Sequence, residues 1–174
     1  MSDSELVSEC LKGKSSAQRT LFQLHSGKMF AVCLRYMGNT MEAEEVLQES
    51  FIKVFEKLNQ WKGDGPLGGW IRTIVVNTSL TRIKNNKKFR LDKDIDEAIS
   101  LSDNGEDQLE ALQAADLMKL IAQMPDGYKT VFNLFVVEGY GHKEIADLLG
   151  ISESTSKTQF LKAKNWLVKR INEQ

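Results

Sequence analysis

The chain has 174 residues, and its 23 basic and 24 acidic side chains leave a formal net charge of −1 at pH 7. A charge so close to zero argues weakly against a nonspecific nucleic-acid coat, although bases gather in residues 82–93 and 157–170 and acids in residues 92–110. A hydrophobic content of 41% can fill one core or two small ones, and two prolines are too few for the turns of a β-sandwich. We therefore expect an all-α protein.

Several classes of protein are disfavoured by what the sequence lacks. The longest apolar runs, such as Thr130 to Val137, fall far short of the roughly 20 residues that span a bilayer, and the first five residues do not resemble a signal peptide. Cys10, Cys33, His25 and His142 are scattered, so neither metal-ligand spacing, disulfide spacing nor a catalytic grouping is present. We expect a cytoplasmic protein that makes no membrane contact of its own, is not an enzyme, and needs no metal or cofactor.

Two helices are predicted before residue 40. The first covers about Ser4 to Lys12, has one apolar side, and stops at a glycine. The second is capped by Ser15 or Ser16 and ends at Gly38-Asn39. The pair Ser26-Gly27 leaves open a break within this second helix.

The third predicted helix, Thr40 to Leu58, is amphipathic and acidic. Asn39 is a suitable N-cap, and Glu42 three residues later completes a pair that satisfies free amides at the helix start. The apolar stripe consists of Ala43, Leu47, Val54 and Leu58. The opposite side, which we expect to be solvated or to meet a partner, carries Glu45, Glu49, Lys53 and Glu56.

The stretch from Asn59 to Trp70 carries four glycines, one proline and two tryptophans, so we expect an irregular loop. The helix that follows aligns aromatic, hydroxyl, amide and basic side chains in one row: Trp70, Thr73, Asn77, Thr81, Lys84 and Lys88. The residues expected to turn inward are Ile71, Ile74, Val75 and Ile83. Aromatic faces stack unpaired bases, amides bind base edges and lysines hold phosphates, so this row is typical of a single-strand nucleic-acid surface. The alternative is that Trp61 and Trp70 are core residues and the lysines a solvated helix end.

An acidic stretch from Asp92 to Asp107 has little to bury, and we interpret it as a linker. Helical patterns resume from about Gln108 to Met124 and from Tyr128 to Glu138, with a turn at Pro125-Asp126-Gly127 between them.

The last part of the chain has the order of a helix-turn-helix: a short helix from His142 to Leu149, the turn Gly150-Ile151-Ser152, and a longer helix from about Glu153. The inner row of the last helix is Ser156, Phe160, Ala163, Leu167 and Ile171. The outer row is Ser154, Lys157, Thr158, Leu161, Lys162 and Asn165. Lysine can bind guanine or phosphate and threonine can touch a thymine methyl, so the outer row suits a major groove. The alternative is a charged solvent face on an ordinary helical hairpin.

Two parts of the chain resemble one protein family, in that family's order. Glu42 to Phe55, Trp61 to Asp64 and Trp70 to Asn77 look like region 2 of the extracytoplasmic-function (ECF) branch of the sigma-70 family, the bacterial RNA polymerase specificity subunits. His142 to Thr155 and Lys157-Thr158 are similar to region 4 of the same family. The two matches span almost the whole chain and are far more specific than a short motif.

The resemblance implies two small helical domains, residues 1–90 and residues 108–174, joined by a flexible acidic linker, residues 91–107. The first domain would dock on the clamp helices of the polymerase β′ subunit and would recognise and melt the minus-10 promoter element. The second would bind the minus-35 element as duplex. The linker would thread the polymerase toward its active-site and RNA-exit channel, an electropositive passage.

The resemblance also implies site residues. Those for minus-10 binding are Trp61, Lys62, Gly63, Asp64, Trp70, Thr73, Asn77, Thr81 and Lys84. Those for minus-35 binding are Ser154, Thr155, Lys157, Thr158, Leu161 and Lys162. Polymerase docking would use the mixed polar and apolar face of Gln48, Glu49, Ile52 and Phe55, although Ile52 and Phe55 could instead be core residues.

The implied partners are core RNA polymerase, promoter DNA and an anti-sigma factor that covers the same surfaces, with the free protein a monomer. The sequence departs from the family at Lys62, where arginine is usual, at Pro66 to Gly69, where an aromatic is usual, and at Ser156, where an apolar residue is usual. The outer row carries lysine where arginine is common, and lysine cannot make arginine's bidentate contact.

A competing interpretation is a free-standing helix-turn-helix regulator that binds duplex DNA and uses the N-terminal domain to sense or to dimerise. It explains the C-terminal pattern equally well. It leaves the Trp61 to Trp70 loop and the polar row after it unexplained.

Overall fold

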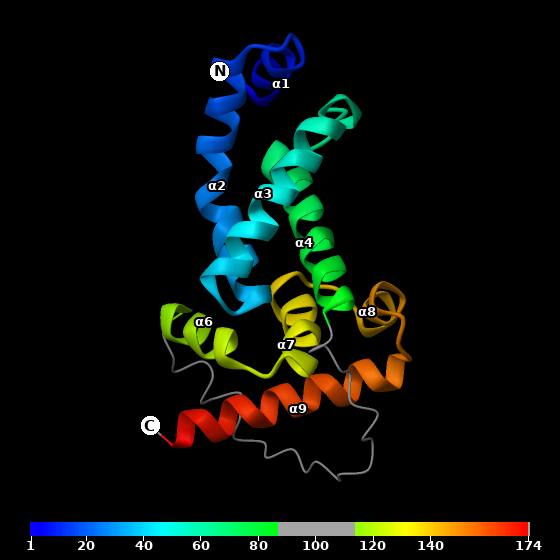
Figure 1. The fold of residues 1–174 in the computed structure, drawn as a ribbon. Helices are drawn as coiled ribbons and strands as arrows, with labels where there is room; N and C mark the ends of the chain where they lie inside the picture. The colour runs from blue at the N-terminus through cyan, green and yellow to red at the C-terminus, as the bar shows by residue number, and fades with distance from the viewer. Residues whose placement is uncertain (87–113, 174) are drawn as a thin grey trace. The chain divides into compact units, whose positions relative to one another are not determined.

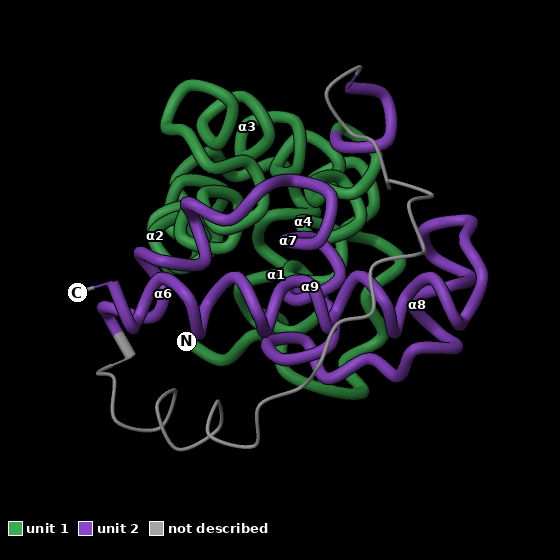
Figure 2. The backbone as a smooth tube through the Cα atoms, turned by 90° about the horizontal axis from the view of Figure 1, so that it is seen from below, with its two compact units in different colours: residues 1–82 green, residues 83–174 purple. Residues whose placement is uncertain are grey.

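The computed structural model describes residues 1–86 and 114–173, and the regular elements in these two ranges are all helices (Figure 1). The prediction of an all-α protein is confirmed. The chain divides into two compact units, residues 1–82 and residues 83–174 (Figure 2). The predicted linker at residues 91–107, Lys88 and the predicted helix start at Gln108 lie outside the described residues.

Unit 1 contains four helices and a short turn of 3-10 helix within its described residues. They are α1 (Asp3–Leu11), α2 (Ser15–Met37), α3 (Thr40–Lys57), η1 (Leu58–Gln60) and α4 (Leu67–Asn85), whose last turn extends past the boundary of the unit. α2 packs along α3, and α1 packs on α2 and η1. Leu21, Tyr36, Leu58 and Ile71 are among the most completely buried side chains. Each apolar side chain of this size stabilises the fold by about 1.5–3 kcal/mol when buried.

Side-chain caps fix the starts of two of these helices. At α3 the predicted cap is confirmed, because the Glu42 amide donates a hydrogen bond to Asn39 Oδ1 at 2.8 Å. At α1, Ser2 and Glu5 form a reciprocal capping box, which the sequence analysis missed.

α2 is continuous, so the break left open at Ser26-Gly27 does not occur. A glycine inside a helix costs about 1 kcal/mol relative to alanine, and burial of residues such as Cys33 in the following turns offsets that cost. The predicted cap at Ser15 or Ser16 is wrong: the helix already begins at Ser15, and Lys14 occupies the cap position without a side-chain bond. Helical dihedral angles start one residue earlier than a serine cap would require.

The buried side of α3 is shifted from the predicted stripe. Three of the four predicted residues are buried, but Leu47 is only half-buried and its neighbour Val46 is fully buried. Ser50 is also buried, and its hydroxyl donates to the Val46 carbonyl at 2.6 Å. A serine is tolerated in this core because the helix's own backbone satisfies the hydroxyl.

α4 begins at Leu67, so the prediction that the loop continues to Trp70 is wrong and Gly68 and Gly69 lie in the first helical turn. A tertiary contact explains the early start. The amide of Leu67, a fully buried residue, donates to the Asp3 carboxylate at 3.1 Å and thereby gains the acceptor that a helix start needs. A β-carbon at Gly68 would lie 3.6 Å from the His25 ring, an ordinary van der Waals contact, so α4 passes next to α2 at this point.

Unit 2 is organised around one long helix. Its elements from residue 114 onward are α6 (Ala114–Gln123), α7 (Asp126–Phe132), the π-helical turn η2 (Asn133–Val137), α8 (His142–Leu149) and α9 (Glu153–Asn172). Helices α6, α7 and α8 all pack on α9. The core of this packing consists of Leu120, Ile121, Met124, Phe132, Ala163 and Leu167.

One predicted element of unit 2 differs in the structure. The helix predicted from Tyr128 to Glu138 begins at Asp126, directly after Pro125, and widens into the π-helical turn in its second half. Proline suits a helix start because its missing N–H has no helical partner there. The buried Lys129 is held by an ion pair from its Nζ atom to Asp126 Oδ1 at 3.1 Å, which ties the new first turn together.

The contact between Asp3 and Leu67 gives a test of what positions α4. Asp3→Ala should accelerate amide hydrogen exchange in the first turn of α4 about fivefold, because losing a capping acceptor costs about 1 kcal/mol. Asp3→Asn keeps an acceptor oxygen and should retain most of the protection. Exchange measured by mass spectrometry on peptides that cover residues 67–72 checks both variants, and equal exchange in Asp3→Ala and the native chain would contradict the capping role.

Candidate nucleic-acid interface

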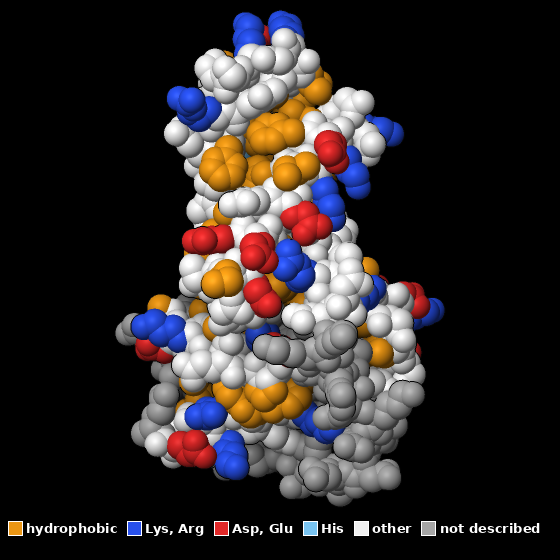
Figure 3. Space-filling model, viewed as in Figure 1, with side chains coloured by type: hydrophobic (Ala, Val, Ile, Leu, Met, Phe, Trp, Pro, Cys, Tyr) orange, Lys and Arg blue, Asp and Glu red, His pale blue; other side chains and the backbone are white. Residues whose placement is uncertain are grey.

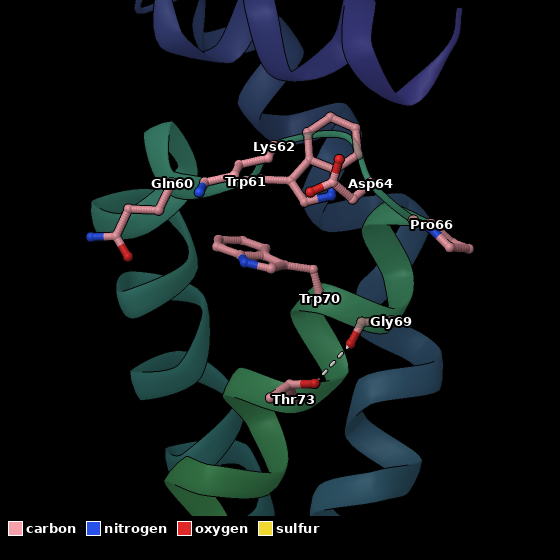
Figure 4. Close-up of a pocket in the computed structure, with 9 residues that line it drawn as sticks. Gln60, Trp61, Lys62, Asp64, Pro66, Gly69, Trp70 and Thr73 are labelled. Atoms are coloured by element: carbon pink, nitrogen blue, oxygen red, sulfur yellow. Dashed lines mark hydrogen bonds between the residues drawn. The ribbon is translucent and has the colours of Figure 1, made fainter.

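An open hollow of about 440 Å³ lies where η1, the following loop and the first turns of α4 meet (Figure 4). It brings together five of the predicted minus-10 residues: Trp61, Lys62, Asp64, Trp70 and Thr73. Gln60 and Pro66 also line it, and the sequence analysis did not select them. The hollow is large enough for a nucleobase, since small-molecule pockets begin at about 300 Å³.

The two tryptophans stand at neighbouring sides of this hollow, Trp70 projecting from α4 and Trp61 from the segment after η1 (Figure 4). Both indoles are half-buried, so neither is a core residue and the core interpretation is wrong. Gly63, two residues after Trp61, has a φ of 77° that favours glycine. The segment after η1 and the first turn of α4 therefore each present one partly exposed aromatic ring to the hollow.

The predicted polar row of α4 faces solvent. Thr73, Asn77, Thr81 and Lys84 are all exposed, at successive turns of the helix. The Thr73 and Thr81 hydroxyls donate to the backbone carbonyls of Gly69 and Asn77, at 3.1 and 3.0 Å, so their oxygen lone pairs and methyl groups are what they offer a ligand. The Asn77 amide offers both donors and an acceptor.

The opposite side of α4 is buried, as predicted. Ile71, Val75 and Ile83 are buried and Ile74 is half-buried. Two hydroxyl residues, Thr78 and Ser79, lie on the same buried side, and each donates to the carbonyl four residues earlier, at 2.7 and 2.8 Å. α4 is thus held by one face while the other carries the polar row.

The predicted docking face lies on the exposed side of α3. Ile52 is 60% exposed, so the alternative that it is a core residue is wrong. Phe55 is half-buried and its ring lies 6.4 Å from that of Phe51, which in turn meets Phe22 of α2 edge-on at 4.9 Å. Figure 3 shows exposed hydrophobic side chains on this face of the molecule, next to a band of mixed acidic and basic side chains.

Part of the acidic side of α3 is already paired within unit 1. Arg82 of α4 lies 3.0 Å from Glu45 and 3.7 Å from Glu49, and Lys53 lies 3.6 Å from Glu49. The hydrogen bond that Arg82 donates to the Glu45 carboxylate raises the pKa of Arg82 above its ordinary value. All these groups are partly exposed, so each pair contributes little stability by itself. Their arrangement leaves Gln48 and Ile52 as the more accessible members of the docking face.

The helix-turn-helix has the predicted bounds, with α8 at His142–Leu149 and α9 from Glu153. Gly150 ends α8 with a φ of 68°, a left-handed conformation that favours glycine. Ser152 caps α9 by accepting a hydrogen bond from the Thr155 amide at 3.0 Å. Both ends of the turn are therefore fixed by local chemistry.

A polar joint inside the helix-turn-helix explains the serine in the inner row of α9. Ser156 is completely buried, and its Oγ lies 2.8 Å from Nδ1 of His142, the first residue of α8. The His142 ring stacks on Phe135, with centroids 4.4 Å apart, and meets Phe160 edge-on at 5.7 Å. The sequence analysis missed this joint, and the only signal for it was a hydroxyl at a position that should be apolar.

The outer row of α9 is not uniformly exposed. Ser154 and Lys157 are exposed, whereas Thr155, Thr158, Leu161 and Lys162 are half-buried. Lys157 makes an exposed ion pair with Glu153 at 3.6 Å, and the Thr158 hydroxyl donates to the Ser154 carbonyl at 3.0 Å. Because an exposed ion pair of this kind is weak, Lys157 can exchange Glu153 for a phosphate at low cost.

Other kinds of site find no support in the described residues. Among residues 1–86 and 114–173, no group of three His, Cys, Asp or Glu residues is placed to hold a metal ion, and no helix is long and apolar enough to cross a membrane. Cys10 and Cys33 are buried free thiols, and burial raises the pKa of Cys33 to about 11. A thiol with so high a pKa is a poor nucleophile at neutral pH.

Comparison with known proteins shows that both units are similar to domains of one family. The family model described as sigma-70 region 2 matches residues 21–89, and that described as sigma-70, region 4, matches residues 114–167. The chain is 24% identical over 178 residues to the ECF RNA polymerase sigma factor SigW of Bacillus subtilis, covering 96% of this chain and 95% of that protein. It is 22% identical over 180 residues to the RNA polymerase sigma-H factor of Pseudomonas aeruginosa, covering 97% and 93%. A solved structure of the sigma factor RpoE in complex with the anti-sigma factor NepR from Bartonella quintana is similar with a TM-score of 0.49 and 16% identity, covering 89% and 96%.

The joint between α8 and α9 predicts how unit 2 responds to pH. Burial, aided by Lys157 and opposed by Glu153, lowers the pKa of His142 below its ordinary 6.5. The unfolded chain therefore binds a proton at His142 more readily than the folded chain. The contribution of the neutral ring to the free energy of unfolding is complete above about pH 6.5 and declines as the pH falls. The Cε1 proton of His142 should titrate by NMR with a midpoint below 6.5.

The matching control is His142→Gln, which removes that resonance. Protection of the α9 amides against hydrogen exchange should decline between pH 6.5 and 5 in the native chain and much less in this variant. A midpoint at or above 6.5 for His142 would mean that the ring is not shielded as the joint requires.

Proposed function

We propose, on the premise that the chain belongs to the ECF branch of the sigma-70 family, that its two units divide promoter recognition between them. The chain is a sigma factor that directs transcription initiation. In the proposed division, residues 1–90 bind core polymerase and melt the minus-10 element, and residues 108–174 bind the minus-35 element. A protein with this task works in the bacterial cytoplasm, where RNA polymerase meets chromosomal DNA.

The observation that carries the minus-10 half is the hollow between Trp61 and Trp70. A base leaves the duplex only if the cost of unstacking, a few kcal/mol, is repaid elsewhere. Stacking on an aromatic side chain contributes about 1–3 kcal/mol for each base and needs no particular sequence. Two half-exposed indoles beside a hollow of about 440 Å³ offer that compensation for an extruded base.

The polar row continues the same surface along α4. Asn77 lies two turns beyond Trp70, and its amide can pair with the edge of an unpaired base without the desolvation of a charge. Lys84 lies two turns further and suits a phosphate of the displaced strand. Stacking, base contact and phosphate contact therefore follow one another on one exposed helix face.

The docking half rests on Ile52. Ile52 is 60% exposed among the charged side chains of α3 and offers an apolar group that a partner can cover. Together with Gln48, Glu49 and the half-buried Phe55 it gives a small apolar centre with a polar rim, the composition of a protein interface. We assign this face to the clamp helices of the polymerase β′ subunit.

The minus-35 half rests on the start of α9. The turn and its caps present Ser154 and Lys157 to solvent at the N-terminal end of the helix, which is the end that enters the major groove in helix-turn-helix proteins. Half-buried Thr158, Leu161 and Lys162 follow along the same row. We place these three side chains against base edges, because a contact with a base edge needs less exposed side-chain area than Ser154 and Lys157 have.

We extend the proposal to an anti-sigma factor, a protein inhibitor that would cover the docking and DNA-binding surfaces of the free monomer. The competing interpretation, a free-standing regulator, needs only unit 2 and gives no role to the tryptophan hollow. A stable homodimer that binds duplex operators without polymerase would favour that competitor.

Reconstituted transcription tests the assignment in unit 1. With core polymerase and genomic fragments, the native chain should produce promoter-specific run-off transcripts. Asn77→Ala should keep polymerase binding but lose most of the permanganate reactivity that marks melted minus-10 DNA, because the base loses its edge contact. Ile52→Asp should act at an earlier step. It should abolish polymerase binding itself, since it places a charge in the apolar centre of the interface.

Glu44→Ala is the control for these variants, because Glu44 is exposed on α3 outside both proposed surfaces. It should transcribe like the native chain. Full melting by Asn77→Ala would remove that residue from the site, and a native chain that neither binds core enzyme nor starts transcripts would refute the proposed function as a whole.

Unit 2 is tested through the salt dependence of promoter binding. Lys157→Ala should weaken holoenzyme binding to all minus-35 sequences and reduce the slope of log K against log salt by about 0.9, the value for one phosphate contact. Lys162→Ala, at a half-buried position, should instead relax specificity by about 1–3 kcal/mol at one base pair. Lys169→Ala, three turns further along α9, is the control and should change neither quantity. If Lys157→Ala and Lys162→Ala both behave like that control, the outer row is only a solvated face.

A further inference from the structure

The first turn of α4 carries Trp70, yet its own sequence favours a helix only weakly. Gly68 and Gly69 lie in this turn, and glycine is the poorest helix former apart from proline because it loses the most backbone freedom on ordering. The turn closes where the Trp70 amide donates to the Pro66 carbonyl at 3.4 Å, beyond the usual length of such a bond. The place of the Trp70 ring beside the hollow therefore depends on support from outside this turn (Figure 4).

That support comes from the first helix of the chain. Asp3, in the first turn of α1, accepts a hydrogen bond from the Leu67 amide at 3.1 Å, three residues before Trp70. The first amides of a helix have no partner within the helix, so a carboxylate at this point satisfies one of them and also interacts favourably with the helix dipole. Leu67 is completely buried, which keeps its amide directed at Asp3.

α1 and α2 both meet α4 at this point. A β-carbon at Gly68 of α4 would contact the His25 ring of α2 at 3.6 Å. Burial lowers the pKa of His25 below its ordinary value and the Asp3 carboxylate opposes this, so Asp3 lies close enough to act on the ring. α1 also packs on η1, the turn directly before Trp61. One helix therefore contacts both segments that carry a tryptophan of the hollow.

We propose that Asp3 is a positioning residue for promoter melting: by fixing the first turn of α4, it holds the Trp70 ring where an extruded base can stack. The inference rests on the proposed function, because it takes the hollow as the place of that base. Asp3 itself touches no DNA and acts through Trp70. Its charge alone predicts the opposite effect, since a carboxylate near a nucleic acid repels phosphates and its removal would favour binding.

Melting of a promoter by the holoenzyme tests this role, with permanganate reactivity of the minus-10 region as the readout and binding to core polymerase as a second measurement. Asp3→Ala should slow melting about fivefold and leave polymerase binding unchanged, because base capture must then order the turn that the carboxylate orders in the native chain. Asp3→Asn keeps an acceptor oxygen and should melt at close to the native rate. Glu9→Ala removes the same charge from α1 at a position that pairs with Lys12, at 3.2 Å, and is the control, which should melt like the native chain.

Two double variants separate positioning from general stabilisation. Trp70→Ala should itself reduce melting, and adding Asp3→Ala to it should have little further effect, because the ring that Asp3 positions is gone. Gly68→Ala should restore most of the melting rate to Asp3→Ala, because alanine favours the helical turn and its β-carbon would meet His25 at an ordinary contact distance. Gly68 is not among the residues that line the hollow, so this change leaves the place of the base as it is.

Each contrary result has its own meaning. If Trp70→Ala melts promoters like the native chain, the proposed minus-10 function fails, and this inference fails with it. If Trp70→Ala reduces melting but Asp3→Ala does not, only the positioning role is refuted. Equal losses in Asp3→Ala and Asp3→Asn would mean that the charge of Asp3 matters and its hydrogen bond does not. Loss of polymerase binding in Asp3→Ala would mean that unit 1 as a whole depends on Asp3, which would also overturn the proposal.

Discussion

The DNA-binding surface proposed for unit 1 depends on α4 being held by one face alone. Val75 and Ile71 are completely buried, and two hydroxyl residues in the same buried face satisfy themselves on their own helix backbone. The Arg82 pairs with Glu45 and Glu49 brace the far end against α3. Because the buried face supplies the packing of α4, the side chains on its exposed face are not needed for folding. They can therefore be ones that bind a nucleic acid.

In unit 2, a polar contact between two helices holds the DNA-binding helix α9 in place. The pairing of His142 with Ser156 fixes the start of α8 against the second turn of α9, and the stacked rings of Phe135 and His142 fix the angle of approach. Ser156 is completely buried and its hydroxyl pairs with the half-buried His142 ring, so a packing of α9 that separated them would deprive the hydroxyl of this partner at a cost of about 1–3 kcal/mol. Apolar residues at these positions would stabilise the core but would not select one orientation of α9.

Periodicity and capping chemistry were sufficient to predict most of the fold. The helix-turn-helix bounds, the Asn39 cap and the solvent-facing row of α4 all follow from patterns within about eight residues. What the sequence did not reveal depends on contacts between distant residues. The start of α4 is set by Asp3, 64 positions away, and the role of Ser156 by a histidine 14 positions earlier. The hollow that α1 lines together with the segment Trp61 to Gly63 was missed for the same reason, because these two segments meet only in the folded chain.

The thiol of Cys33 has a practical consequence. Cys33 is fully buried on α2 and shares a side-chain hydrogen bond with Ser79 of α4. With a pKa of about 11, only about one molecule in ten thousand carries the reactive thiolate at pH 7. Alkylating reagents and peroxides consequently have almost nothing to attack while α2 and α4 stay together. Labelling at Cys33, measured separately from labelling at Cys10, therefore reports how readily α2 and α4 separate.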